Sequence, residues 1–244
     1  MKYLGGKTKI SKYIVPIMED YRLDSQAWVE PFVGGCNTII NASGTRYGND
    51  IRSDLIDLWE SVTYDQYAPP ENIDKKMYNA IRNNPDGFTP ELRAFVSIGC
   101  SFRGKKWGGY AENKNGRNYV QEASKGVMQK ANKLRGVIFS RGSYDNMYIP
   151  PKSIIYCDPP YKNTTGYNVE FDHDLFWKWC RAKALEGHTV FISEYEAPED
   201  FIEIWRKSWK CNLSDSKKNS IEKLFIMSKS GVNDRRNPMF SFCY

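Results

Sequence analysis

Strand-like and helix-like segments alternate through both ends of this chain, and this alternation constrains its fold more than any other feature. Near the start, residues 9–21 have apolar side chains at helical spacing, and residues 28–32 form a short apolar segment typical of a strand. The alternation resumes after residue 136, where Asp172 can cap a helix over 172–186. Such a pattern predicts an α/β fold with a mostly parallel sheet and helices on both of its faces.

A segment of different texture, residues 64–135, interrupts this alternation. Within it, residues 101–110 mix glycine, cations and aromatics without any period, which is typical of a loop. We therefore predict a main domain made of residues 1–63 and 136–244, with an inserted, largely helical and loop subdomain over 64–135. Further strands are expected at residues 46–49, 137–140, 153–157, 189–193, 223–227 and 239–244, and further helical segments at 37–43, 53–62, 71–83 and 89–97.

The composition excludes several classes of protein. No apolar run approaches the roughly 20 residues that span a bilayer, and the first residues lack the apolar stretch of a signal peptide. We therefore expect a soluble, cytoplasmic protein without a membrane partner. The 6 cysteines lie far apart, without the paired spacing of a zinc site or a redox dithiol, so we expect free thiols. With only 2 histidines and no carboxylate cluster, no metal site is expected.

The positive charge is concentrated in one part of the chain. The net charge is +6, whereas residues 75–141 alone hold 14 Lys or Arg against 4 Asp or Glu, a surplus of +10. The remainder of the chain is therefore slightly acidic. A basic excess this concentrated indicates a surface that binds a polyanion such as nucleic acid, although a solvated face can have the same composition.

The tetrapeptide Asp158-Pro159-Pro160-Tyr161 begins where the apolar strand 153–157 stops. In open α/β sheets, ligands bind beyond the carboxyl ends of the strands, so this position is one where chemistry is expected. Two consecutive prolines fix their own φ angles and offer no N–H groups. The carbonyl of Pro159 is therefore held rigidly beside the carboxylate of Asp158, and both groups are hydrogen-bond acceptors.

Two adjacent acceptors suit an amino group attached to an aromatic base. They draw on its two N–H bonds and favour a pyramidal nitrogen whose lone pair can attack a methyl sulfonium, with the arriving positive charge stabilised by the acceptors. Tyr161 would stack on the base, which must leave a duplex before its amino group can be reached. The alternative interpretation is a turn after a strand, where Asp-Pro and Pro-Tyr are common.

Glycines also follow the first strand, in the segment Val29-Glu30-Pro31-Phe32-Val33-Gly34-Gly35. A backbone without Cβ atoms lets a ligand approach closely. Asp50 ends the next strand, where an acidic residue can bind ribose hydroxyls in nucleotide-binding α/β folds. A tight structural turn explains the same glycines equally well. The chain has neither G-x-G-x-x-G nor G-K-[ST] spacing here, which disfavours a dinucleotide or a nucleoside triphosphate.

Taken together, these motifs and their order resemble the Dam-type (D12 class, alpha group) N6-adenine DNA methyltransferases, of phage or mobile-element type. The resemblance covers about the first 60 and the last 110 residues. It implies a Rossmann-like methyltransferase fold with an antiparallel last strand, a catalytic main domain and a target-recognition insert. The motifs that carry it are Tyr3-Leu4-Gly5-Gly6-Lys7, the 29–35 segment, Asn49-Asp50-Ile51-Arg52-Ser53-Asp54-Leu55 and Asp158-Pro159-Pro160-Tyr161.

The resemblance implies transfer of a methyl group from S-adenosyl-L-methionine, without a metal, to the exocyclic amino group of a flipped-out adenine in double-stranded DNA. By this likeness, the cofactor-binding residues are Tyr3, Lys7, Phe32, Gly34, Asp50 and Asp158. The catalytic residues are Asp158, Pro159, Pro160 and Tyr161. For the insert, the candidate DNA-binding residues are Arg103, Lys105, Lys106 and Arg117 for phosphates or guanines, with Trp107 and Tyr110 as wedges beside the vacated base.

The chain departs from the family pattern at three places. Cys36 stands where the family often has a third glycine, and Ser143 stands where many members have an acid that contacts the adenine of the cofactor. The insert lacks the familiar recognition-hairpin pattern of arginine, asparagine and glycine, so no target sequence is assigned. The first two departures bear on cofactor affinity, and the third on sequence specificity.

Two other functions stay open from the residues alone. Related tetrapeptides act on planar amino groups elsewhere, so a methyltransferase for RNA or a protein amide is one alternative. A DNA-binding protein with a lapsed active site, such as a decoy of a phage or mobile element, is the other. The resemblance also suggests a bacterial or phage-infected cytoplasm and a cognate restriction endonuclease as partner. The oligomeric state and the biological role are not assigned.

Overall fold

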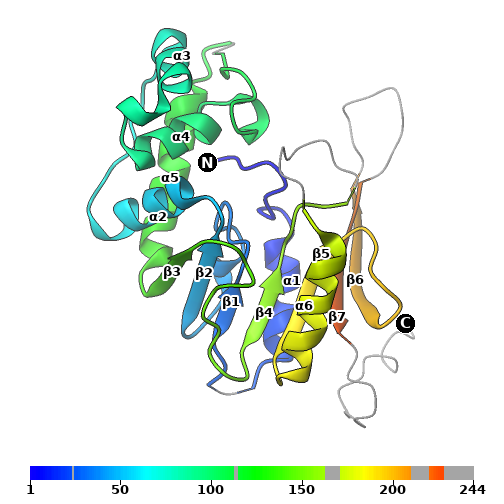
Figure 1. The fold of residues 1–244 in the computed structure, drawn as a ribbon. Helices are drawn as coiled ribbons and strands as arrows, with labels where there is room; N and C mark the ends of the chain where they lie inside the picture. Colours follow the sequence, from blue (N-terminus) through cyan, green and yellow to red (C-terminus); the bar gives the residue numbers. More distant parts are fainter. Residues whose placement is uncertain (24, 113–114, 163–170, 210–219, 228–244) are drawn as a thin grey trace. The chain divides into compact units, whose positions relative to one another are not determined.

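The computed structural model describes residues 1–23, 25–112, 115–162, 171–209 and 220–227. Its internal contacts divide the chain into two compact units, Met1–Pro150 and Pro151–Tyr244. Figure 1 labels the helices and strands of both units. The segment predicted as an insert lies wholly within the first unit.

The first unit contains three parallel strands, β1 (Trp28–Glu30), β2 (Arg46–Asp50) and β3 (Val137–Arg141). β2 is the middle strand: its Arg46 is in register with Trp28 on one side and Val137 on the other. All three residues of β1 are buried, as expected of a parallel strand covered on both faces. β1 ends at Glu30, opposite Gly48, and β2 continues for two more residues to Asp50, so the segment after β1 runs toward the level of Asp50.

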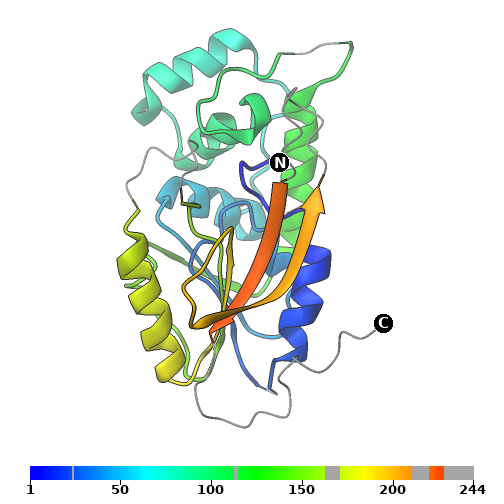
Figure 2. The same cartoon turned by 90° about the vertical axis from the view of Figure 1, so that its right-hand side faces the viewer.

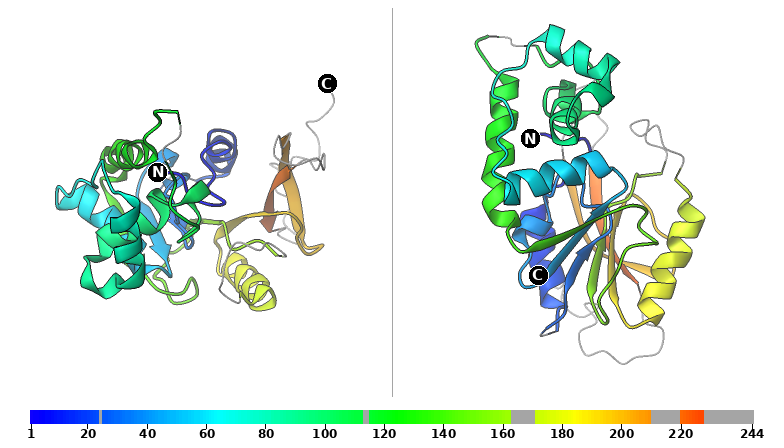
Figure 3. Two further views of the ribbon diagram at one scale, coloured as in Figure 1. Left: turned by 90° about the horizontal axis from the view of Figure 1, so that it is seen from above. Right: turned by 60° about the vertical axis from the view of Figure 1, so that its left-hand side comes forward.

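Helices account for most of the rest of this unit. α2 packs against α4 and α5, and α3 packs against α4; Figure 3 shows α5 beside α2. Leu55, Ile56 and Trp59 of α2 are fully buried. The elements are α1 (Ser11–Asp20), α2 (Ser53–Tyr64), α3 (Lys75–Asn83), α4 (Pro90–Gly99) and α5 (Tyr119–Leu134), with the 3₁₀ helices η1 (Ile39–Asn41), η2 (Pro85–Gly87) and η3 (Phe102–Gly104).

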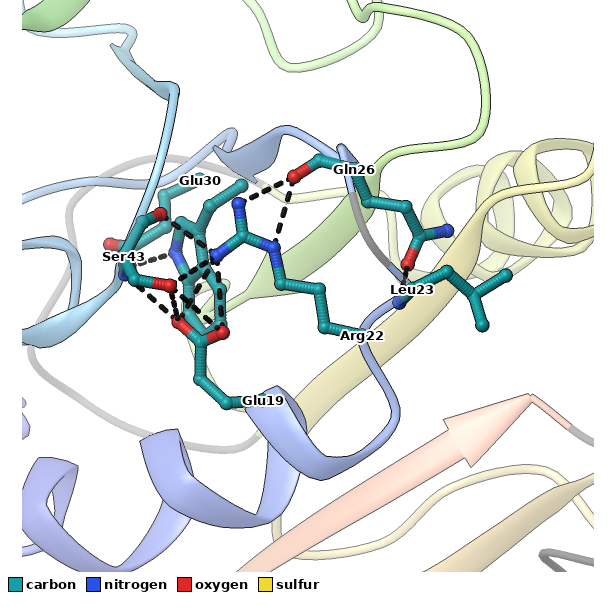
Figure 4. Close-up of polar contacts among 7 residues, drawn as sticks. Glu19, Arg22, Leu23, Gln26, Glu30 and Ser43 are labelled. Atoms are coloured by element: carbon teal, nitrogen blue, oxygen red, sulfur yellow. Dashed lines mark hydrogen bonds and ion pairs between the residues drawn. The ribbon is translucent and has the colours of Figure 1, made fainter.

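A polar cluster around Arg22 joins the end of α1 to the segments before β1 and β2 (Figure 4). The guanidinium group of Arg22 donates to the carboxylate of Glu19 at 3.1 Å and to the carbonyl of Ser43 at 2.8 Å. It also donates to the carbonyl of Gln26. Because the donors of one partly buried guanidinium reach three chain segments, this cluster fixes where β1 begins relative to α1.

The second unit contains β4 (Ile154–Cys157), α6 (His173–Leu185), β5 (Thr189–Glu194), β6 (Phe201–Trp209) and β7 (Ser220–Met227). β4 and β5 are parallel, β7 is antiparallel to β5, and β6 is antiparallel to β7. Figure 2 shows β6 and β7 running side by side. Phe176 of α6 and Phe191 of β5 are fully buried in the core of this unit.

The predicted fold class is confirmed. Parallel pairing occurs in both units, the last described strands are antiparallel, and the described part of the 64–135 segment contains only helices and loops. The predicted cap of α6 is also confirmed, since the side chain of Asp172 accepts a hydrogen bond from Leu175 N. The strand predicted at 239–244 lies outside the described residues, and the helical segment at 37–43 is a single 3₁₀ turn.

Two elements were not predicted from the sequence, namely the 16-residue helix α5 and the strand β6. The 4 cysteines that the structure describes, Cys36, Cys100, Cys157 and Cys180, are buried free thiols, as predicted. Among the described helices, none combines the length and the apolar character needed to cross a membrane. The division into a main domain and an insert stays a prediction.

Candidate functional site

The glycines after β1 form a tight loop beneath Tyr3. Gly34 has φ +45°, a left-handed conformation that favours glycine. A Cβ atom on Gly34 would lie 3.0 Å from the ring of Tyr3, and one on Gly35 would lie 2.8 Å from the Cβ of Tyr3. The two predicted cofactor motifs therefore pack directly on each other, and side chains at these two positions would force them apart. We call residues 33–37 the glycine loop.

Asp50, at the end of β2, holds this loop in place. Its Oδ2 accepts a hydrogen bond from Gly34 N at 2.9 Å, and its Oδ1 accepts one from Arg52 N at 3.0 Å. The carbonyl of Gly34 is held as well, because Trp59 Nε1 donates to Gly34 O at 2.9 Å. Burial raises the pKa of Asp50, while the two backbone hydrogen bonds oppose that shift. Both polar backbone groups of Gly34 are thus fixed by side chains.

The other predicted cofactor residues of this unit lie around the same loop. Lys7 is 5% exposed, and its ammonium group donates to Gly5 O at 2.9 Å. The ring of Phe32 lies 5.2 Å from the ring of Tyr144, tilted by 30°. Ser143, which stands in place of the family's acid, accepts a hydrogen bond from Asn146 N through its carbonyl at 3.2 Å. The structure therefore gathers Tyr3, Lys7, Phe32, Gly34 and Asp50 at the carboxyl ends of β1 and β2.

In the second unit, the predicted catalytic tetrapeptide directly follows the buried strand β4. Asp158 is half-buried and Pro159 is buried. The hydroxyl of Tyr161 donates to Glu222 Oε2 at 3.0 Å, and its ring meets the ring of Tyr195 edge-on at 4.7 Å. Burial raises the pKa of Tyr161 well above its usual range, and the carboxylates of Asp158 and Glu222 add to the shift. The phenol therefore stays protonated, and its position is fixed at both ends.

Sequence reasoning assigned no role to Glu194, which ends β5. This carboxylate is 2% exposed, and its Oε2 accepts a hydrogen bond from the backbone of Lys162, the residue after the tetrapeptide, at 3.2 Å. Its Oε1 accepts another from Tyr195 N at 2.7 Å. Glu194 therefore ties the loop that carries Asp158 to β5. The available signal was an acid at the end of an apolar strand, next to the strand that carries the tetrapeptide.

The cationic residues predicted to bind DNA are largely at the surface. Arg103, Lys105 and Lys106 are exposed, and Arg103 has φ +57° within the turn of η3. Arg117 is exposed as well, but its guanidinium group forms two hydrogen bonds to the carboxylate of Glu122, at 2.6 and 2.9 Å. A phosphate at Arg117 would have to compete with that carboxylate.

The two predicted wedge residues lie against a buried tyrosine. The rings of Trp107 and Tyr110 lie 5.5 and 5.6 Å from the ring of Tyr78. The hydroxyl of Tyr110 donates to Ile73 O at 2.7 Å, and that of Tyr78 bonds to Ser101 Oγ at 2.8 Å. Such packing is expected of a surface loop whose aromatic side chains pack against the protein beneath it. Their role as wedges stays a prediction.

In the part of the chain that the structure describes, no group of three His, Cys, Asp or Glu side chains could hold a metal ion. The carboxyl ends of β1, β2 and β4 present hydrogen-bond acceptors, glycine backbone and aromatic rings.

Residues 3–97 match the family model of D12 class N6 adenine-specific DNA methyltransferases, so the predicted resemblance is confirmed over this segment. Among curated proteins, no significant match to the sequence is found. Similar solved structures include a conserved hypothetical protein of Streptococcus pyogenes, at 8% identity and TM-score 0.36, over 87% of this chain and 94% of that one. An rRNA methyltransferase, AviRa of Streptomyces viridochromogenes, has 8% identity and TM-score 0.38, over 88% and 83%. Likenesses this distant add nothing to the fold described above.

Proposed function

We propose that this chain is a DNA methyltransferase that transfers a methyl group from S-adenosylmethionine to the N6 amino group of adenine. The observation that carries the proposal is that Asp158 and Pro159 directly follow the buried strand β4, so that a carboxylate and a proline carbonyl are adjacent acceptors at the strand end. The family match over residues 3–97 supports it from the opposite part of the sequence, because that match covers the glycine loop and Asp50.

The glycine loop fits the proposed cofactor. Gly34 and Gly35 let Tyr3 pack directly on the backbone at the carboxyl end of β1, and Asp50 places a carboxylate at the same end of β2, as in nucleotide-binding α/β folds. We assign cofactor binding to Tyr3, Lys7, Phe32, Gly34, Asp50 and Asp158. When bound, the cofactor supplies an electrophilic methyl group on a sulfonium.

In this proposal, the residues of the tetrapeptide prepare the acceptor. Asp158 and the Pro159 carbonyl accept hydrogen bonds from the two N–H groups of the adenine amino group, which turns the nitrogen lone pair out of the plane of the base. The same oxygens stabilise the positive charge that develops on nitrogen. Once the nitrogen has gained the methyl group, it releases one of these protons toward the Asp158 carboxylate, which leaves a neutral N6-methyl amine. Tyr161 stacks on the flipped-out base, and its anchoring by Glu222 and Tyr195 fixes the orientation of its ring before the base arrives.

The test is methyl transfer to double-stranded DNA from cofactor with a labelled methyl group, followed by identification of N6-methyladenine in the digested product. Asp158→Ala should lower the rate by at least about 100-fold, the usual effect of removing one group that stabilises developing charge. DNA affinity should stay largely unchanged. Asp174→Ala is a matched control, because Asp174 is an exposed acid in the same unit. Equal transfer by wild type and Asp158→Ala would refute the mechanism.

The same assay separates the alternatives. Label that appears in RNA or in a protein amide, with none in DNA, would assign a different acceptor. Binding of DNA by the wild type without any transfer would indicate a lapsed enzyme. Of these acceptors, the basic surplus in residues 75–141 favours a polyanion over a peptide. Pairing with a restriction endonuclease is a further part of the proposal, since sequence-specific adenine methylation is what protects DNA from such a partner.

A further inference from the structure

Lys130, on helix α5, reaches the glycine loop from a distant part of the sequence. Its ammonium group donates to Gly35 O and, at 2.6 Å, to Asn37 Oδ1. It also lies 5.5 Å from the centre of the Trp59 ring, in a cation–π contact. The side chain is partly buried, and burial lowers the pKa of its amine to about 8. These contacts direct Lys130 into the protein and toward the loop.

Three side chains hold polar backbone groups of Gly34 and Gly35 in the glycine loop. Asp50 accepts from Gly34 N, Trp59 donates to Gly34 O, and Lys130 donates to Gly35 O. A loop with φ +45° at Gly34 and φ +52° at Cys36 cannot satisfy these groups by regular secondary structure. Because Lys130 contacts the carbonyl next to the one that Trp59 holds, its loss would release the second half of the loop.

Asn37 extends the contact to the N-terminal motif. Its Oδ1 accepts hydrogen bonds both from Lys130 and from Thr8 Oγ1, the latter at 2.9 Å. Its Nδ2 lies where Cβ atoms on Gly6 and Gly35 would be only 2.6 and 2.9 Å away. Lys130 therefore fixes the side chain around which the two glycine motifs meet.

We propose that Lys130 is a positioning residue for the cofactor: it shapes the glycine loop for S-adenosylmethionine without contacting DNA. This inference rests on the proposed function. α5 lies in the segment predicted as the target-recognition insert, so the insert helps to build the cofactor site. A second hydrogen bond also connects the predicted insert to the cofactor motifs, since Leu4 N donates to Gly104 O at 3.1 Å.

The test is calorimetric binding of S-adenosylhomocysteine to the full chain without DNA. Lys130→Met keeps the length of the side chain but removes its donors, and should weaken binding at least tenfold. Lys130→Arg keeps a cation with donors and should recover part of that loss. Lys125→Met is the matched control, because Lys125 is an exposed lysine on the same helix, and it should bind like the wild type.

Amide hydrogen exchange distinguishes a local change in the glycine loop from a general loss of stability in the Lys130 variants. In Lys130→Gln, which retains an amide donor, the amides of residues 35–38 should exchange faster than in the wild type, while those of β4 and β5 should not. Wild-type affinity in Lys130→Met together with wild-type exchange in Lys130→Gln would overturn the inference. Failure of the wild type itself to bind the analogue would instead overturn the proposed function, so the two failures are distinguishable.

Discussion

Cys36 shows how one residue can depart from a family pattern while keeping its geometry. It stands where the family often has a third glycine, and it adopts φ +52°, the left-handed region that glycine enters without cost. For another residue this conformation costs about 1–2 kcal/mol. Cys36 is fully buried, and burial raises the pKa of its thiol well above the usual range, so the side chain remains a neutral thiol. Burial of the side chain contributes free energy that opposes the backbone strain.

Substitutions at Cys36 should therefore follow backbone strain more closely than hydrophobicity. Cys36→Gly relieves the strain but loses the burial of the sulfur, so the free energy of unfolding should stay within about 1 kcal/mol of the wild type. Cys36→Val fills a similar volume, but its β-branch suits φ +52° poorly and should cost a further 1–3 kcal/mol or so. Urea denaturation measures both values. A valine variant more stable than the glycine variant would contradict the strain argument.

Candidate site residues at the ends of strands could be predicted from the sequence. Residues that reach the site from other elements could not. Gly34 and Asp158 each follow a short apolar run, and Asp50 ends the predicted strand 46–49, so their position at a strand end was visible without coordinates. Glu194 carried the same signal but its contact with the residue after the tetrapeptide was not visible, and Lys130 had no signal at all, because its contacts join residues distant in the sequence. A lysine on a basic helix looks like a surface cation until its partners are known.

Among the helices and strands, α5 and β6 escaped prediction for different physical reasons. Half of the buried residues of α5 are small (Ala123, Ser124 and Ala131), so large apolar side chains mark its buried face at only three positions and its apolar period is weak. β6 pairs only with β7 among the described strands, and a register shift between Glu203 and Trp205 breaks the alternation on which strand prediction depends. Strands paired regularly within the parallel parts of the sheet were all predicted.

Glu194, at the end of β5, should affect catalysis by positioning the loop that carries Asp158. Glu194→Ala leaves two backbone N–H groups, those of Lys162 and Tyr195, without their acceptor, and so loosens the loop after Asp158. A misplacement of about 1 Å can cost on the order of 100-fold in rate, so kcat for methyl transfer should fall by about 10- to 100-fold. Binding of S-adenosylhomocysteine should fall much less than kcat, because Asp158 is the only assigned cofactor-binding residue on this loop and the glycine loop is untouched. Rates measured at saturating DNA give kcat separately from KM.

Two further variants separate this positioning role from a general loss of stability. Glu194→Gln keeps one carbonyl acceptor and should retain more activity than Glu194→Ala. Glu196→Ala removes an exposed acid two residues along the chain and should behave like the wild type. A fall in cofactor affinity as large as the fall in kcat would show that Glu194 acts on the fold rather than on the tetrapeptide.

Over the whole molecule, the surplus of +10 in residues 75–141 overstates the charge that can meet DNA. Several of these cations already have partners within the protein. Arg141 pairs with Asp57 and Glu60, Arg93 pairs with Asp86, and Lys130 is bound to the glycine loop. The total could be counted from the sequence, whereas its division between internal pairs and surface depends on the fold. The exposed pair Lys105 and Lys106 remains the best candidate for phosphate contacts.

Salt dependence of DNA affinity distinguishes these two kinds of cation. Each phosphate neutralised contributes about −0.9 to the slope of log K against log salt concentration for duplex DNA. The double variant Lys105→Ala/Lys106→Ala should therefore make the slope shallower by about 2 if both residues contact phosphates. Lys130→Met removes one charge of the same sign but should leave the slope unchanged, because its amine is held within the protein. Fluorescence anisotropy of labelled duplex DNA, without cofactor and over a range of salt concentrations, gives all three slopes.

An unchanged slope in the double variant would exclude this loop as the binding surface, and a shallower slope in Lys130→Met would place Lys130 at the DNA.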